Sequence, residues 1–391
     1  MKTIAVLTGG GDVPGLNVAI RAITLRAAAE GMRVLGIRRG WAGLVEMSRE
    51  AGADNSDSVV ELTPGVVRTS ARTGGTILHT SRTRPSHTTR DRVPAHLRPI
   101  YAEETNDLTP EVLTNLEHLG VDTLIPIGGD DTLSYAHRLH REGARVVAIP
   151  KTMDNDVPGT DYCIGFSTCV ARTIELAHRL RTPAGSHERI MVIEVFGRYA
   201  GFTALVPALA GAADRCLIPE HPFDAEHLVR LLVADRDSNP SRYAAVLVSE
   251  GATFAGHSEM SVTDEETDAY GHKKLGGIGD AVANAIKLHS TAFNEGRRVN
   301  TMSQRLTYLV RSGAPDAMDS IIPQAYGHLA MDLVAEKRSG VLVALRDGSY
   351  RPVSLEVMAE GARSVDVNLW YDPDELRPLD AALGRSSIFP G

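Results

Sequence analysis

The sequence predicts an α/β protein of two lobes, built from mostly parallel sheets with helices against their faces. Short β-branched apolar runs alternate with segments whose apolar residues recur at helical spacing, which is typical of βαβ units. This alternation recurs in both halves of the chain. At 391 residues, the chain is also longer than one hydrophobic core usually serves, so we expect two lobes.

In the first half, the alternation begins at the N-terminus. Strands are expected at 3–8, 34–37, 122–127 and 144–149, with an edge strand at 59–62. Helices are expected at 16–29, 112–119 and 133–142, and a compact turn at 40–44.

The second half repeats the pattern. Strands are expected at 189–195, 215–218, 243–248 and 305–310, with a last strand at 340–344. Helices are expected at 167–181, 203–213, 229–232, 278–289 and 321–336. The polar, glycine-containing segment 253–275 predicts a surface hairpin or flap.

Composition narrows the class of protein. The net charge of −8 argues against a nucleic-acid or anionic-membrane partner. No apolar run approaches membrane-spanning length, and the N-terminus shows no signal-peptide pattern. Cys163, Cys169 and Cys216 fit neither a metal spacing nor a disulfide framework. We therefore expect a cytoplasmic protein.

A glycine loop, Gly9–Gly15, joins the first strand to the first helix. Such a loop can present backbone N–H groups and a helix N-terminus to a phosphate. It is not a Walker A loop, because Leu16-Asn17 follows it, and Pro14 breaks the dinucleotide fingerprint. A tight turn is the alternative, but three consecutive glycines exceed what a turn needs, which favours phosphate binding.

A second feature is the stretch Pro150–Asp156, which follows an apolar strand closed by Pro150. Asp154 and Asp156 lie two residues apart and repel each other, which suggests a metal, a cationic partner or proton transfer. Asp and Asn are also common in turns because their side chains bond their own backbone. This stretch alone does not decide between the two readings.

The neighbouring loops favour a site. Residues 9–15, 128–132 and 151–156 each follow a strand of one βαβ series, and parallel strands end at the same edge of a sheet. Two glycine loops and two acidic loops meeting there indicate a phosphate-plus-metal site. The hydroxyls and arginines at 79–84 could also hold a phosphate, but by themselves they are typical of a solvated loop.

Glycine loops, carboxylates and arginines together suit phosphoryl transfer, which needs positioning, charge neutralisation and a base. The patterns of P-loop and protein kinases are absent from the sequence. A regulatory module that binds a sugar phosphate or nucleotide without chemistry is the alternative. The acidic pair argues against it, because carboxylates beside phosphates need a metal or a proton-transfer task.

Five motifs in order resemble those of the phosphofructokinase family, over roughly residues 3 to 345. They are Gly9–Asn17, Gly128–Thr132, Pro150–Asp156, Phe196–Tyr199 and Ser249–Gly251. The resemblance implies a phosphofructokinase-like fold of Rossmann-like three-layer sandwiches with the active site between two lobes. Residues 1–165, completed by about 320–365, would form the large lobe and bind the phosphoryl donor and Mg²⁺. Residues 166–319 would form the small lobe and bind the sugar phosphate.

The same resemblance implies residue roles. Asp154 would be the base for the sugar C1 hydroxyl, Asp130 would hold Mg²⁺, and Thr152 and Asp156 would support both. The donor would contact Gly11, Arg82, Gly129, Asp131, Thr132 and Lys151. The sugar phosphate would contact Phe196, Gly197, Arg198, Glu250 and Tyr308, with Arg189 and Arg311 reaching it across a subunit boundary. That implies a homodimer or homotetramer with shared active sites.

Two positions predict the donor. In ATP-using members of the family the two central loops resemble Gly-Gly-Asp-Gly and Pro-Gly-Thr. This chain has Asp131 in place of the last glycine of the first loop and Lys151 in place of the glycine of the second. In the family, this pair of residues marks the pyrophosphate-dependent branch. Asp131 adds bulk and charge where a nucleotide would approach, and Lys151 suits compact pyrophosphate. We therefore expect reversible, Mg²⁺-dependent transfer from pyrophosphate to fructose 6-phosphate, in glycolysis or gluconeogenesis, with an ATP-dependent kinase as the alternative.

One segment departs from the family pattern. Residues 308–320 only partly resemble its Gly-His-x-Gln-Arg-Gly-Gly stretch, and Ser320 stands where many members carry an arginine for the 6-phosphate. One guanidinium fewer would weaken phosphate binding by about 1.5–3 kcal/mol. Fructose 6-phosphate is favoured as substrate, and sedoheptulose 7-phosphate or another sugar phosphate is the alternative. We expect no strong control of activity by allosteric effectors.

Overall fold

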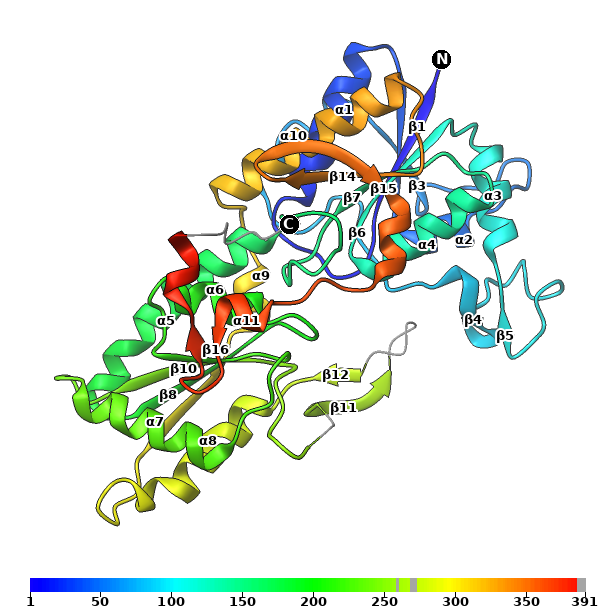
Figure 1. Cartoon of the computed structure of the whole chain (residues 1–391). Helices are drawn as coiled ribbons and strands as arrows, with labels where there is room; N and C mark the ends of the chain where they lie inside the picture. The colour runs from blue at the N-terminus through cyan, green and yellow to red at the C-terminus, as the bar shows by residue number, and fades with distance from the viewer. Residues whose placement is uncertain (258–259, 268–272, 385–391) are drawn as a thin grey trace.

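A computed structural model describes residues 1–257, 260–267 and 273–384 (Figure 1). Its two main sheets are largely parallel and are flanked by helices, which confirms the predicted fold class. Within the described residues, no helix is both long enough and apolar enough to cross a membrane.

The larger sheet has seven strands in the order β15-β14-β7-β6-β1-β2-β3. Its five inner strands are parallel, and β3 and β15 are antiparallel edges, so the predicted edge strand at 59–62 is confirmed. The strand bounds are β1 Thr3–Thr8, β2 Arg33–Ile37, β3 Val59–Leu62, β6 Thr123–Gly128, β7 Val147–Pro150, β14 Val341–Arg346 and β15 Ser349–Ser354.

Helices cover both faces of this sheet. On one face α1 (Leu16–Ala29) and α10 (Ala317–Ala335) pack side by side (Figure 1). The other face carries α2 (Trp41–Glu46), α3 (Thr109–His118) and α4 (Asp130–Arg141). Because side chains alternate along a strand, β1 sends Ile4 and Val6 into one core cluster and Ala5 and Leu7 into the other.

The smaller sheet has four parallel strands in the order β13-β8-β10-β9. Helix α5 packs against α6, and α7 packs against α8. The bounds are β8 Ile190–Val195, β9 Arg215–Leu217, β10 Ala244–Ser249, β13 Thr301–Arg305, α5 Phe166–Ser186, α6 Phe202–Leu209, α7 Ala225–Ser238 and α8 Ile278–His289. Strands β11 (Val262–Thr267) and β12 (Lys273–Leu275) pair antiparallel, as the predicted hairpin requires.

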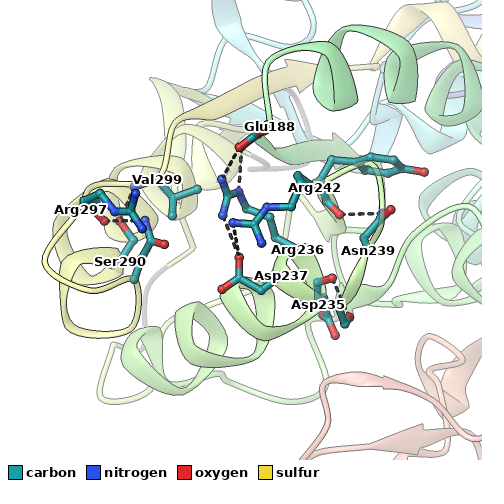
Figure 2. Close-up of polar contacts among 12 residues, drawn as sticks. Glu188, Asp235, Arg236, Asp237, Asn239, Arg242, Ser290, Arg297 and Val299 are labelled. Atoms are coloured by element: carbon teal, nitrogen blue, oxygen red, sulfur yellow. Dashed lines mark hydrogen bonds and ion pairs between the residues drawn. The ribbon is translucent and has the colours of Figure 1, made fainter.

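Buried Arg236 fixes the end of the smaller sheet at which β8 begins (Figure 2). Its Nε donates to the Glu188 carbonyl at 2.8 Å, and Nη1 pairs with Asp237 at 2.9 Å. The bond to Glu188 ties the C-terminal end of α7 to the turn that leads into β8, and the bond to Asp237 lies within α7.

The C-terminal part of the chain returns from the larger sheet to the smaller one. The 3₁₀ helix η5 (Leu355–Glu360) follows β15, and the chain then reaches α11 (Val367–Trp370) and the short pair β16 (Tyr371–Asp372) and β17 (Arg377–Pro378). The Tyr371 hydroxyl donates to the Cys216 carbonyl at 2.8 Å. This return brings residues after 360 between the two sheets (Figure 1).

Two predicted elements were wrong, and one confirmed strand was wrongly expected to be the last. The strand expected at 305–310 lies at Thr301–Arg305, because that polar segment pairs in register with β8, and Tyr308–Arg311 is the short helix α9. The turn at 40–44 is part of helix α2, whose buried Trp41 packs edge-on against Tyr135. The strand predicted at 340–344 is confirmed as β14, but it is not the last strand, because β15 follows it and pairs with it as an edge.

Two helices are longer than predicted, because their caps were missed. Asp224 accepts from the His227 amide at 2.8 Å and starts α7. Asp316 accepts from the Asp319 amide at 2.9 Å and starts α10. A capping carboxylate satisfies an amide that has no partner in the first turn.

Candidate active site

The loops after β1, β6 and β7 meet at one edge of the larger sheet. Thr8 is in register with Ile127, and Gly128 with Pro150, so these three parallel strands end together. They border a cavity of about 190 Å³. Its lining comprises Gly10, Gly11, Arg82, Gly129, Asp130, Asp131, Thr132, Lys151, Thr152, Asp154, Asp156, Arg198, Tyr199 and Ala362.

The acidic stretch combines the turn and the site that it predicted. Buried Asn155 lies in the left-handed region (φ 56°) and holds the loop, since its Oδ1 accepts from the Cys163 amide at 2.8 Å and its Nδ2 donates to the Asp161 carbonyl at 3.1 Å. Thr152 Oγ1 accepts from the Asp154 amide at 3.1 Å. The turn bonds therefore use Asn155 and Thr152, and they leave both carboxylates facing the cavity.

Asp154 is the carboxylate whose surroundings are most unusual. Its Oδ1 is buried and has no hydrogen-bond partner among the described residues. Burial, followed by the nearby charge of Glu250, raises the pKa of Asp154 above its usual range. Burial and the charge of Asp154 likewise raise the pKa of Asp156. A carboxyl that ionises nearer neutrality and lacks a partner can accept a proton from a ligand.

Lys151 is the cation at the centre of the cavity. It is only 4% exposed, and its backbone N–H donates to the Gly128 carbonyl at 2.8 Å. Burial, followed by the positive charges of Arg311 and Arg82, lowers the pKa of Lys151 to about 8. Buried Lys151 and the two guanidinium groups near it repel one another, and such a cluster of cations is suited to a compact polyanion.

The first glycine loop packs closely around two of these cations. Gly10 has φ +78°, and a Cβ there would lie 3.2 Å from Lys151 Nζ. A Cβ on Gly11 would lie 3.0 Å from Arg311 Nη2. Arg311 also pairs with Asp12, so its guanidinium lies at the glycine loop of its own chain.

The segment 79–84 is not a free solvated loop. The Gly10 amide donates to the Ser81 carbonyl at 3.1 Å, and the Thr80 hydroxyl donates to the Gly10 carbonyl at 2.6 Å. These two bonds fix Arg82 at the cavity wall.

The smaller sheet contributes the opposite wall through the loop after β8, residues 196–201. Arg198 and Tyr199 line the cavity. Gly197 has φ +116°, and a Cβ there would lie 2.7 Å from the Ala200 carbonyl, so the turn requires glycine. Glu250, at the end of β10, donates its amide to the Val195 carbonyl at 2.9 Å, and burial raises the pKa of its carboxyl to about 7.

Several predicted residues lie outside the cavity. Arg189 precedes β8, at the opposite end of that strand from Phe196, and directly follows Glu188, whose contacts with Arg236 Figure 2 shows. Tyr308 is 67% exposed, and its ring centroid lies 5.2 Å from the Arg311 guanidinium carbon. The Ser320 hydroxyl donates to the Asp316 carbonyl at 2.6 Å, within its own helix.

The phosphofructokinase family model matches residues 3–334, which is most of the chain. The chain belongs to the phosphofructokinase family. It is 36% identical to the pyrophosphate--fructose 6-phosphate 1-phosphotransferase of Dictyoglomus thermophilum, over 93% of this chain and 95% of that protein. It is 35% identical to ATP-dependent 6-phosphofructokinase 3 of Streptomyces coelicolor, over 93% and 96% of the two chains.

Solved phosphofructokinase structures share the fold. The pyrophosphate-dependent phosphofructokinase from Marinobacter aquaeolei matches with a TM-score of 0.70 and 18% identity, over 97% of this chain and 89% of that one. The phosphofructokinase from Saccharomyces cerevisiae matches with a TM-score of 0.71 and 24% identity, over 92% of this chain. This chain spans only 45% of that yeast chain.

Three cavity residues were not predicted. Gly10 and Tyr199 lie within the predicted motifs Gly9–Asn17 and Phe196–Tyr199, so the motifs themselves were the available signal. Ala362 belongs to the returning C-terminal segment and carries no functional group, so nothing in its sequence context indicated the site.

Proposed function

We propose that this phosphofructokinase family member transfers a phosphoryl group reversibly from pyrophosphate to the C1 hydroxyl of fructose 6-phosphate. The products are fructose 1,6-bisphosphate and phosphate. The observation that carries this proposal is that one small cavity is lined both by Asp154, whose buried Oδ1 has no hydrogen-bond partner among the described residues, and by buried Lys151.

Asp154 acts as the general base. Its Oδ1 accepts the proton of the C1 hydroxyl while the hydroxyl oxygen bonds to phosphorus, and the bond from that phosphorus to the leaving phosphate breaks. Burial, followed by the charge of Glu250, raises the pKa of Asp154 and with it the basicity of its carboxylate. Such a base contributes roughly 10²–10⁴-fold to the rate.

The donor lies against the larger sheet. Lys151, Arg82 and Arg311 supply positive charge around the glycine loop, and Gly11, Gly129 and Thr132 allow close approach of backbone to phosphate. Pyrophosphate would stabilise the charged form of Lys151 by placing a further anion against this buried ammonium. Asp131 lines the same cavity and adds a carboxylate where the rest of a nucleotide would extend.

Mg²⁺ fits the carboxylates that border the donor. Among the described residues, no group of three or more His, Cys, Asp or Glu is arranged to hold a metal. Mg²⁺ usually binds through one or two carboxylates together with substrate phosphates. Asp130 would be the ligand, with Asp156 nearby, and the ion would neutralise charge on the phosphates. The charge of Asp130 raises the pKa of Asp156, and a cation would relieve that repulsion.

The sugar phosphate binds on the side of the smaller sheet. Arg198 supplies a cation at the cavity wall, and Phe196, Gly197 and Glu250 shape the loops around it. Residues 1–165 with about 320–365 would thus serve the donor, and 166–319 the sugar. Because Ser320 bonds its own helix, sedoheptulose 7-phosphate or another sugar phosphate is the second candidate for this half of the site.

A homodimer or homotetramer would complete the site. Arg189 lies too far along β8 to reach the cavity of its own chain. Exposed apolar side chains occur in α9, which carries Arg311, at Tyr308 and Leu309, and in the first turns of α10 at Met318 and Ile321. An apolar patch of this kind is typical of an interface. The unpaired buried cysteines suit a cytoplasmic location.

Phosphorus NMR tests the reaction. Purified protein with Mg²⁺, pyrophosphate and fructose 6-phosphate should convert the pyrophosphate signal into equal amounts of phosphate and a new sugar-phosphate ester. The same experiment with sedoheptulose 7-phosphate tests the second sugar. Hydrolysis of pyrophosphate without ester formation, or no reaction with any sugar phosphate, would refute the proposal.

A further inference from the structure

Residues 361–366, here called the strap, connect η5 beside the larger sheet to α11 beside the smaller one (Figure 1). Ala362 lines the catalytic cavity. The next residue, Arg363, does not line that cavity, but it contacts the loops on both sides of it.

Arg363 holds the catalytic loop through two backbone carbonyls. Its amide donates to the Asp156 carbonyl at 2.8 Å, and its Nη1 donates to the Thr160 carbonyl at 2.8 Å. One residue therefore anchors both ends of segment 156–160, which follows directly after Asp154.

The strap also holds the loop of the smaller sheet that contains Arg198. The Arg363 guanidinium carbon lies 4.8 Å from the ring centroid of Phe202, which is 2% exposed and begins α6 just after residue 201. Glu220 Oε1 accepts from the Val365 amide at 2.7 Å and from the Gly201 amide at 3.0 Å. Both contacts end on the loop 196–201 or on the helix that continues it.

We propose that Arg363 is a positioning residue that sets the spacing between Asp154 and the loop 196–201. This inference rests on the proposed function, in which the base and the sugar phosphate come from opposite sides of the cavity. General-base catalysis needs reacting atoms about 3–3.5 Å apart, and a misplacement of about 1 Å costs roughly 100-fold. A clamp that touches both loops without touching substrate therefore acts on the chemical step more than on binding.

Kinetics of Arg363→Leu test the clamp. We expect kcat to fall by about tenfold or more, while KM for fructose 6-phosphate and for pyrophosphate each changes by less than about threefold. Arg363→Lys, which keeps a donor and the cation over Phe202, should recover part of kcat. Arg346→Leu is the matched control. Arg346 and Arg363 both line a second cavity of about 340 Å³, but among the described residues the Arg346 side chain makes no hydrogen bond to residues 154–160. Its kcat should stay within twofold of wild type.

Hydrogen exchange separates this inference from the proposed function. In Arg363→Leu, peptides covering 155–164 should exchange at least tenfold faster, and in Arg346→Leu they should not. If wild type shows no turnover, the proposed function fails, and the exchange comparison still decides whether Arg363 holds the loop. Unchanged exchange and unchanged kcat in Arg363→Leu, or equal changes in both variants, would overturn the inference. If Arg363→Leu does not fold, Arg363→Gln replaces it with the same expected results.

Discussion

Replacing Lys151 with methionine should make the ligand-free protein more stable and the enzyme less active. Methionine has a similar length and no charge. Lys151 is 4% exposed and lies beside Arg311 and Arg82, so its ammonium loses hydration and meets like charges in the folded protein. A structural lysine would show the opposite effect, because its removal would leave partners unsatisfied.

The size of the effect follows from the pKa of Lys151. Folding lowers it from the usual 10.5 to about 8. At about 1.4 kcal/mol per tenfold, charged Lys151 costs the folded state up to about 3 kcal/mol at pH 7. Because the folded pKa is the lower one, this cost is fully present below about pH 8 and disappears as the pH rises towards 10.5. At pH 9.5, about 1.4 kcal/mol should remain.

Urea denaturation of the ligand-free proteins at pH 7 and pH 9.5 measures how much charged Lys151 lowers the free energy of unfolding. Lys151→Met should exceed wild type in free energy of unfolding at pH 7, and the difference should shrink by about half at pH 9.5. Its kcat/KM for pyrophosphate should fall roughly 10- to 100-fold, since one charged hydrogen bond is lost. Exposed Lys287→Met is the control and should change neither quantity. A variant less stable than wild type at pH 7 would refute the reasoning.

Three further predictions concern single features of the site and the fold. Asp154→Asn should lower kcat by about 10²–10⁴-fold. In wild type, kcat should decrease as the pH is lowered through the pKa of Asp154, which lies well above 3.8 because of burial and Glu250. A pH profile from 4.5 to 8 in which wild type keeps its full kcat at low pH would contradict this. Asp131→Gly combined with Lys151→Gly should shift the ratio of kcat/KM for ATP to that for pyrophosphate towards ATP by at least about tenfold, and an unchanged ratio would show that other residues select the donor. Asp319→Ala should lower the free energy of unfolding by at least about 3 kcal/mol, because buried Asp319 accepts hydrogen bonds from Tyr162, Gly165 and Thr168. The control Asp332→Ala breaks only an exposed ion pair with Arg26 and should cost less than about 1 kcal/mol. Equal losses of stability in the two variants would contradict this prediction.

The inner strands of both sheets were predictable because they are short, apolar and β-branched, and such runs have few alternatives once buried. The failures lie where pairing or capping outweighs pattern. Strand β13 is polar and forms because β8 offers a free edge, and α9 follows where the apolar pattern suggested continued strand. Edge strand β15 carries exposed side chains and gives no apolar signal.

The site was predictable to the extent that its residues follow strands. Lys151, Asp154 and Asp156 meet the glycine loops because parallel strands end together. Contacts made between distant segments gave no such signal. Arg311 reaches the glycine loop of its own chain, and Arg363 reaches the catalytic loop from near the C-terminus; neither spacing has a local pattern that would indicate it.

The ratio of kcat/KM for pyrophosphate to that for ATP, with fructose 6-phosphate and Mg²⁺, tests the central claim most directly. We expect a ratio of at least about 100. Asp131 places a carboxylate where a nucleotide would extend, and buried Lys151 adds a cation that binds pyrophosphate. A ratio below one would contradict the account, because the same two residues would then stand in a site that prefers ATP.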